Sequence, residues 1–66
     1  MRIGELAAQA GVHVETLRYY ERRGLLCKPA RLRSGFRSYP PEALRVVRFI
    51  KQAQGLGFTL EDIAQL

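Results

Sequence analysis

Four side chains between residues 15 and 22 have the chemistry that contact with a nucleic acid requires. Arg18 and Arg22 are cations, Glu15 is a hydrogen-bond acceptor, and Tyr19 combines an aromatic ring with a hydroxyl group. At helical spacing the four residues share one face. Arginine binds guanine edges or phosphates, glutamate can accept a hydrogen bond from a cytosine amino group, and tyrosine can contact a phosphate or a thymine methyl group. The pattern favours a helix in the major groove of DNA, and the alternative is an ordinary solvated face.

The opposite face of the same segment is apolar and predicts packing on a preceding helix. Val14, Leu17 and Tyr20 form this apolar arc. Upstream, apolar residues at helical spacing predict a helix over residues 3–10 that ends at Gly11. The short link between the two helices is typical of a helix-turn-helix, which we expect over residues 3–23.

Positive charge is concentrated around this segment. The chain of 66 residues has 11 Lys and Arg against 6 Asp and Glu, and its net charge is +5. Between Arg18 and Arg37 there are seven basic residues and a single acid, Glu21, so this stretch alone carries +6. Such a stretch is typical of a surface that neutralises phosphates, and the alternative is a solvated arginine-rich face.

Residues 30–39 predict a two-stranded β-hairpin that would form a wing. Ser34-Gly35 is a turn sequence between two short segments in which large or apolar residues alternate with Arg or Ser. We expect Leu32 and one aromatic residue to pack on the helices, because an isolated hairpin is only marginally stable in water. The other face of the hairpin would present three arginines to a phosphate backbone: Arg31, Arg33 and Arg37.

Two further helices complete the predicted fold. Pro40-Pro41 favours the start of a helix over residues 41–56. Its buried face is expected to contain Ala43, Val46, Val47, Ile50 and Ala53. Thr59 can cap a helix over residues 60–66, whose first turn is acidic. The predicted fold class is therefore mostly α: a winged helix-turn-helix of about four helices with a two-stranded β-hairpin wing.

Several classes of protein are excluded by composition. No apolar run approaches the roughly 20 residues that a transmembrane helix needs, so we expect a cytoplasmic protein with no membrane partner. Cys27 and His13 are the only residues of their kinds, which excludes an intramolecular disulfide and the usual zinc sets. We expect Cys27 to be partly buried beside the wing and His13 to be an exposed, poor helix cap. No nucleophile–base pair, paired carboxylates or phosphate-binding loop is present, so we expect no enzyme activity.

Seven short motifs follow one another along the chain. They are Ile3-Gly4-Glu5-Leu6-Ala7, Gly11-Val12, Glu15-Thr16-Leu17-Arg18-Tyr19-Tyr20-Glu21, Arg23-Gly24-Leu25-Leu26, Gly35-Phe36-Arg37-Ser38-Tyr39, Arg48-Phe49-Ile50 and Leu56-Gly57-Phe58-Thr59-Leu60-Glu61-Asp62-Ile63. In order and spacing these motifs closely resemble the N-terminal domain of MerR-family transcription regulators, over essentially all 66 residues. The resemblance implies a winged helix-turn-helix that binds operator DNA as a dimer, with the second helix in the major groove.

The resemblance and the helical periodicity together define the predicted DNA-binding residues. They are Glu15, Thr16, Arg18, Tyr19, Tyr20 and Arg22 on the second helix, and Arg31, Arg33, Arg37 and Tyr39 on the wing. By resemblance, Arg37 and Tyr39 match the family's Arg-x-Tyr ending, which is expected at phosphates. Because Tyr20 lies on the apolar arc, we expect Tyr19 to contact DNA and Tyr20 to be partly structural.

The resemblance also implies partners and a mechanism. Family members bind promoter DNA, act with RNA polymerase, and distort the DNA on effector binding so that the promoter elements align; without effector they often repress. We expect a homodimer for the full-length protein, whereas this shorter chain could be a monomer. The family's dimerisation helix and effector region are expected to be absent from these residues. No cofactor is therefore expected in the chain, and the effector, with a metal ion as one candidate, would bind the missing region.

Two other functions stay open on the sequence alone. One is an architectural, excisionase-like protein that shares the winged fold and bends DNA. The other is a basic protein-interaction domain with no role in nucleic-acid binding, for which the affinity for a partner would not depend on Arg18 or on salt.

Overall fold

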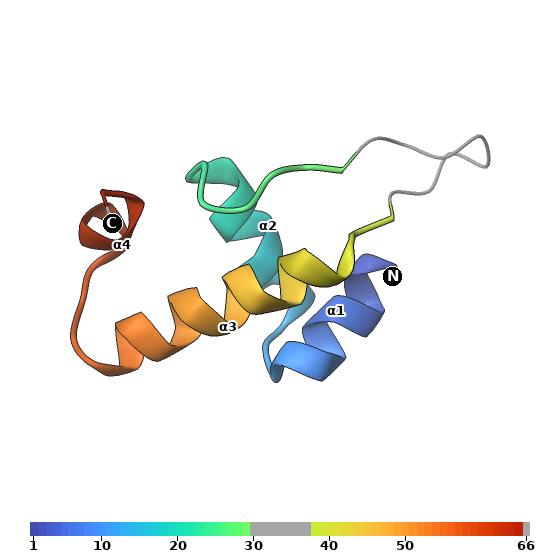
Figure 1. Ribbon diagram of the computed structural model, residues 1–66, viewed down its shortest axis with the longest axis horizontal. Helices are drawn as coiled ribbons and strands as arrows, with labels where there is room; N and C mark the ends of the chain where they lie inside the picture. The colour runs from blue at the N-terminus through green and yellow to red at the C-terminus, as the bar shows by residue number, and fades with distance from the viewer. Residues whose placement is uncertain (30–37, 66) are drawn as a thin grey trace.

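The computed structural model describes residues 1–29 and 38–65, and the regular secondary structure in these ranges is helical. The helices are α1 (Ile3–Ala10), α2 (Val14–Arg22), α3 (Pro41–Gly55) and α4 (Leu60–Ala64). α1 packs against both α2 and α3, and α4 packs against α3. As Figure 1 shows, α3 crosses the molecule, with α1 near its N-terminal end and α4 beyond its C-terminal end. The prediction of a mostly helical fold with four helices is confirmed.

α1 and α2 are joined by a tight turn at Gly11. This residue has φ 71° and ψ 35°, the left-handed conformation that glycine adopts without steric cost. The amide groups of Gly11 and Val12 donate to the carbonyl oxygens of Ala8 and Ala7, at 3.3 and 3.0 Å, which satisfies the C-terminal end of α1. The chain is thereby turned directly into α2, as the helix-turn-helix pattern predicts.

The start of α2 has no side-chain cap. His13 is exposed and its ring makes no capping hydrogen bond. The backbone carbonyl of His13 instead accepts hydrogen bonds from the amides of Thr16 and Leu17, at 3.0 and 3.3 Å. The first turn of α2 is therefore formed by backbone bonds, and His13 is the exposed, poor cap that its residue type predicts.

The core lies where α1, α2 and α3 meet. Its four most deeply buried side chains have 0 or 1% exposure: Leu6, Leu17, Val47 and Ile50. Along α3 the expected face is buried at Ala43, Val47, Ile50 and Ala53, but Val46 remains 38% exposed. Val46 is therefore on the apolar face of α3 but not in the core.

Most of the predicted wing lies outside the described residues. This applies to residues 30–37, which include Leu32 and the predicted turn Ser34-Gly35. Ser38 and Tyr39, at the end of the second predicted strand, are described and do not lie in a strand. The β-hairpin is therefore not confirmed. Cys27, which precedes this segment, is exposed, so its predicted partial burial is wrong.

α4 begins with a capping box. The Asp62 amide donates to the Thr59 hydroxyl at 3.1 Å, and the Thr59 amide donates to the Asp62 carboxylate at 3.0 Å. These reciprocal bonds satisfy two amide groups that a helix start would otherwise leave without partners. The backbone and side-chain hydrogen bonds from Thr59 also hold the pKa of Asp62 below its ordinary value of 3.8.

The lowered pKa predicts that the capping box weakens in acid. The folded carboxyl takes up its proton at a lower pH than the unfolded one, so its stabilising contribution is complete above the unfolded pKa and is lost as the pH falls through the folded value. We expect the wild-type protein to be more stable than Asp62→Asn at neutral pH. We expect it to lose this advantage at pH values below the usual range of carboxyl pKa values. Thermal melts of both proteins as a function of pH test this, and a difference that does not change with pH would contradict it.

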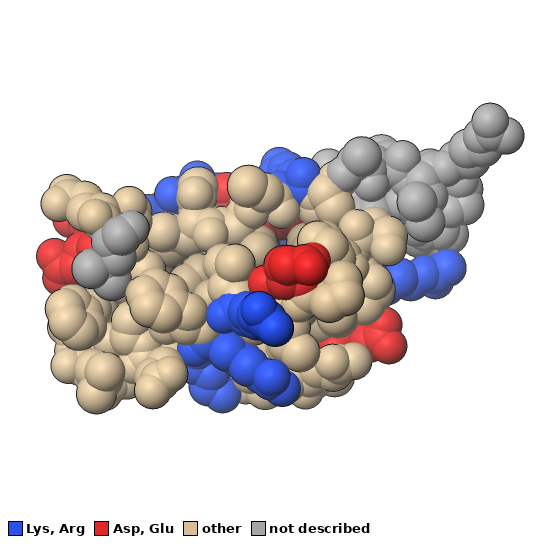
Figure 2. All heavy atoms as spheres, in the orientation of Figure 1, with Lys and Arg blue, Asp and Glu red and all other residues tan. Residues whose placement is uncertain are grey.

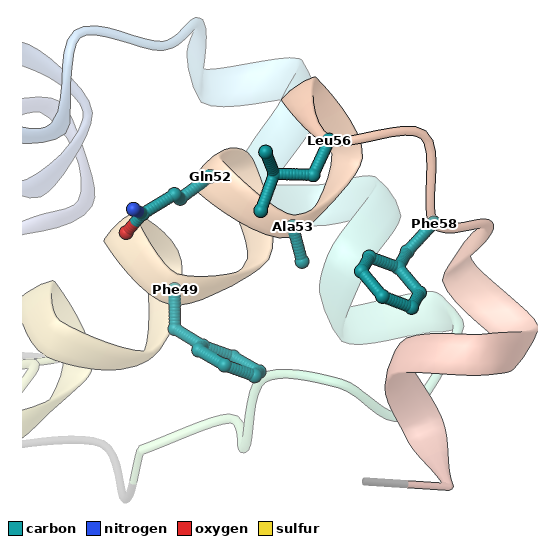
Figure 3. Close-up of a pocket in the computed structure, with 5 residues that line it drawn as sticks. All are labelled: Phe49, Gln52, Ala53, Leu56 and Phe58. Carbon is teal, nitrogen blue, oxygen red and sulfur yellow. The ribbon is translucent and has the colours of Figure 1, made fainter.

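The junction of α3 and α4 carries an open apolar hollow of about 270 Å³. Figure 3 shows the side chains of Phe49, Gln52, Ala53, Leu56 and Phe58 around it. Phe49, Leu56 and Phe58 are 51, 73 and 46% exposed, so this is an apolar surface and not part of the core. None of the described helices is long and apolar enough to span a membrane.

Candidate nucleic-acid interface

The four residues that the helical periodicity places together do share the exposed side of α2. We call Glu15, Arg18, Tyr19 and Arg22 the outer face of α2; all four are exposed. Leu17 and Tyr20 lie on the other side and are 0 and 3% exposed, because they pack into the core. The position of α2 in the fold therefore turns two cations, an acid and a phenol toward solvent.

Arg18 and Glu15 form an ion pair on the outer face. Arg18 Nη1 donates to Glu15 Oε1 at 3.4 Å, and the two side chains are 56 and 76% exposed. An exposed pair at this spacing on a helix contributes little to stability, since both charges remain in water. The guanidinium of Arg18 is therefore available to exchange the carboxylate for a phosphate or a base edge.

Tyr19 is flanked by two guanidinium groups. The Cζ atoms of Arg22 and Arg23 lie 5.7 and 6.0 Å from the centre of its ring. A guanidinium at such a distance is attracted to the π face of the ring. Two cations thus favour the orientation of the Tyr19 ring, and the residue is 41% exposed. The guanidinium groups of both arginines are of a type that also binds phosphates.

Arg23 also connects the end of α2 to α4. Its Nη2 lies 3.3 Å from Glu61 Oε1, and the two side chains are 40 and 80% exposed. Arg23 was not among the predicted DNA-binding residues, although it belongs to the basic stretch. The same is true of Lys28, which is exposed. Both are exposed cations of the basic stretch between residues 18 and 37.

Tyr20, which was expected near DNA but partly structural, and Tyr39, which was expected at a phosphate, are core residues at 3 and 2% exposure. The Tyr20 hydroxyl donates to Gln54 Oε1 at 2.7 Å, and the Tyr39 hydroxyl donates to Glu21 Oε2 at 2.8 Å. Burial raises the pKa of the Tyr20 phenol. Both side chains therefore stabilise the fold, and neither offers DNA an exposed surface.

The other predicted contacts have different outcomes. Thr16 is half-buried on α2, beside the outer face. The wing arginines Arg31, Arg33 and Arg37 lie outside the described residues, so their contacts remain predictions.

On the face of the molecule seen in Figure 2, basic side chains lie at the upper edge and again in the lower half, with acidic side chains between them.

The described residues offer no metal site. Nowhere in residues 1–29 and 38–65 do three or more His, Cys, Asp or Glu side chains come together in a group that could hold an ion. The exposed side chains on the outer face of α2 can act by hydrogen bonding and by charge.

Comparison with known proteins gives one consistent family. The chain matches the family description "MerR HTH family regulatory protein" over residues 1–66. It is 51% identical over 65 residues to a mercuric resistance operon regulatory protein of Bacillus cereus, covering 98% of this chain and 49% of that protein. It is 45% identical over 65 residues to the transcriptional regulator ZntR of Escherichia coli, covering 98% and 46%. The chain thus spans about half the length of the curated relatives it matches.

Solved structures agree with the sequence relatives. A transcription regulator from Ralstonia metallidurans in complex with lead(II) superposes with a TM-score of 0.90 at 43% identity, over 98% of this chain and 51% of the other. HiNmlR, a MerR family regulator lacking the sensor domain and bound to promoter DNA, superposes with a TM-score of 0.88 at 26% identity, over 98% and 49%. Similarity at this level covers the whole arrangement of the four helices.

Proposed function

The chain belongs to the MerR family of helix-turn-helix regulatory proteins, and on this premise we propose that it binds double-stranded promoter DNA with the outer face of α2 in the major groove. Arg18 and Arg22 would bind guanine edges or phosphates, Tyr19 a phosphate or a thymine methyl group, and Glu15 a cytosine amino group. The protein would do so in the cytoplasm as a transcription regulator, without catalysing a reaction.

The exposure of the outer face of α2 is the observation that carries the proposal. Arg18, Tyr19 and Arg22 point to solvent from a helix whose opposite side is anchored in the core by Leu17 and Tyr20. A helix held in this way presents its side chains as a rigid set, which is how a helix-turn-helix reads base edges. The structural relative HiNmlR is bound to promoter DNA, which supports the same ligand class here.

The control of transcription requires more than this contact. We propose that the whole protein binds as a homodimer, so that two copies of α2 reach successive turns of one DNA face. RNA polymerase would act at the same promoter, and the energy of phosphate contacts on both sides would bend and untwist the DNA between them. Membership of the MerR family supports both the proposed dimer and the proposed role of RNA polymerase.

The effector is proposed to be a metal ion bound by residues other than those described. The relatives include a regulator of mercuric resistance and a regulator in complex with lead(II). The described part of this chain has no group of three or more potential ligands.

Selection of binding sites from a pool of random DNA duplexes tests the proposal. We expect the wild-type chain to enrich a short motif and its affinity to fall as salt increases, because phosphate contacts release counterions. Binding without sequence preference would contradict a regulator and favour the architectural alternative. Binding to no duplex at low salt would overturn the assignment.

The wing arginines provide a separate prediction. Arg31→Ala or Arg33→Ala is expected to weaken binding about equally for all duplexes and to make it less dependent on salt, by about one phosphate contact each. Titrations of the selected duplex and of a mixed-sequence duplex at several salt concentrations measure this. A loss confined to the selected sequence would show that the wing reads bases.

A further inference from the structure

The side chain of Arg23 lies between the outer face of α2 and the first turn of α4. Arg23 is the C-cap residue of α2 and directly follows Arg22. Its Cζ atom lies 6.0 Å from the centre of the Tyr19 ring, and its Nη2 atom lies 3.3 Å from Glu61 Oε1 on α4. One cation therefore borders the proposed DNA-binding surface and also contacts a helix outside that surface.

The ion pair with Glu61 uses only part of the Arg23 guanidinium. A guanidinium has five N–H donors, and the contact with Glu61 is made by a single nitrogen. Both residues are exposed, so water weakens the attraction between their charges. A DNA phosphate offers several acceptor oxygens within a densely charged backbone, which makes it a stronger partner for arginine than this carboxylate.

α4 is held in the fold by contacts that do not involve the carboxylate of Glu61. Its capping box is formed by Thr59 and Asp62, and Ile63 is 5% exposed in the core. The contact that the Glu61 carboxylate does make is the one with Arg23. The charge of Glu61 therefore acts on a cation at the edge of the outer face of α2, where a carboxylate also repels phosphates.

From this arrangement we infer that Arg23 binds a DNA phosphate and that Glu61 competes with the phosphate for Arg23. When DNA binds, the guanidinium exchanges the carboxylate for a phosphate oxygen, and the ion pair with α4 opens. The pair thus lowers the affinity for DNA, and DNA in turn weakens the contact between Arg23 and α4. The inference rests on the proposed function, because it adds a contact at the edge of the same surface.

Arg23→Ala tests the phosphate contact. We expect it to weaken binding of a mixed-sequence DNA duplex about tenfold at about 0.1 M salt, and to lower the slope of log affinity against log salt by about one. Arg23→Lys keeps the charge and should retain most of the affinity, because a lysine also binds phosphates. Arg45→Ala, which removes an exposed cation of α3, is the matched control for net charge. An unchanged salt dependence in Arg23→Ala, or an equal loss of affinity in Arg45→Ala, would overturn the inference.

Glu61→Gln tests the competition, because it removes the charge and keeps the size of the side chain. We expect this variant to bind the same duplex about two- to fivefold more tightly than wild type, the range for an exposed ion pair. Glu42→Gln is the matched control, since Glu42 is also an exposed glutamate in the first turn of a helix, α3. Its gain in affinity should be smaller, because only long-range charge changes.

A double-mutant cycle separates competition for Arg23 from direct repulsion of DNA by Glu61. If the carboxylate acts through Arg23, Glu61→Gln gains more affinity in the wild-type chain than in the Arg23→Ala chain. Equal gains in the two chains, or a gain no larger than that of Glu42→Gln, would leave repulsion alone and refute the competition. Weaker binding by Glu61→Gln would refute it as well, because Glu61 would then orient Arg23 for DNA.

All titrations are made below the melting temperature of each variant, with helix content followed by circular dichroism. If Arg18→Ala weakens binding and Arg23→Ala does not, the inference fails and the proposed function stands. If the wild type binds no duplex, both fail.

Discussion

Replacing Leu17 by alanine is expected to leave much of the chain unfolded at 37 °C. Leu17 is 0% exposed and lies on the side of α2 that packs into the core. Truncating a fully buried leucine costs about 2–5 kcal/mol, through lost burial and the cavity that remains. At roughly 0.05–0.15 kcal/mol per residue, a domain of this size has only about 3–10 kcal/mol of stability to lose. Urea unfolding followed by helical circular dichroism measures the change.

Leu56→Ala is the matched control for this prediction. The substitution is the same, but Leu56 is 73% exposed at the end of α3. We expect the control to change the free energy of unfolding by less than about 0.5 kcal/mol, as is usual for surface positions. Similar losses in the two variants would contradict the assignment of Leu17 to the core.

The helix-turn-helix could be predicted because its determinants are local. Apolar residues at helical spacing define α1, and Gly11 takes the left-handed conformation that ends it. The same periodicity separates Arg18 and Tyr19 from Leu17, so the exposed side of the candidate site was available from the sequence. Thr59 likewise caps α4, as its residue type and position predict.

The hydrogen-bond partners of Tyr20 and Tyr39 and the exposure of Val46 could not be predicted, because they depend on distant parts of the chain. The Tyr39 hydroxyl finds its acceptor 18 residues away, at Glu21, and the Tyr20 hydroxyl finds its acceptor 34 residues away, at Gln54. Helical periodicity gives the direction of a side chain but not the neighbour that covers it. For this reason Val47 is buried, whereas Val46, at the edge of the same face, is 38% exposed.

On the outer face of α2, Arg18→Ala is expected to weaken binding of the selected DNA duplex about 5- to 150-fold, equivalent to about 1–3 kcal/mol for a bidentate contact with a base. Helix content should not change, because Arg18 is largely exposed and its ion pair is with the exposed carboxylate of Glu15. Tyr19→Ala should weaken binding in the same way, since the ring projects from the same face. Gel-shift titrations at low salt, with circular dichroism of each variant, measure both effects.

Arg18→Lys and Arg45→Ala show what kind of contact Arg18 makes. Arg18→Lys keeps the charge but loses the planar pair of donors. We therefore expect it to bind a mixed-sequence duplex as tightly as wild type does, but to bind the selected duplex more weakly than wild type. Arg45 is an exposed cation on α3, outside the outer face of α2, and Arg45→Ala should lower affinity only slightly, through long-range charge. Full recovery by Arg18→Lys on the selected duplex would place Arg18 at a phosphate. Equal losses in Arg18→Ala and Arg45→Ala would mean that net charge governs binding, and α2 would then have no special place in the groove.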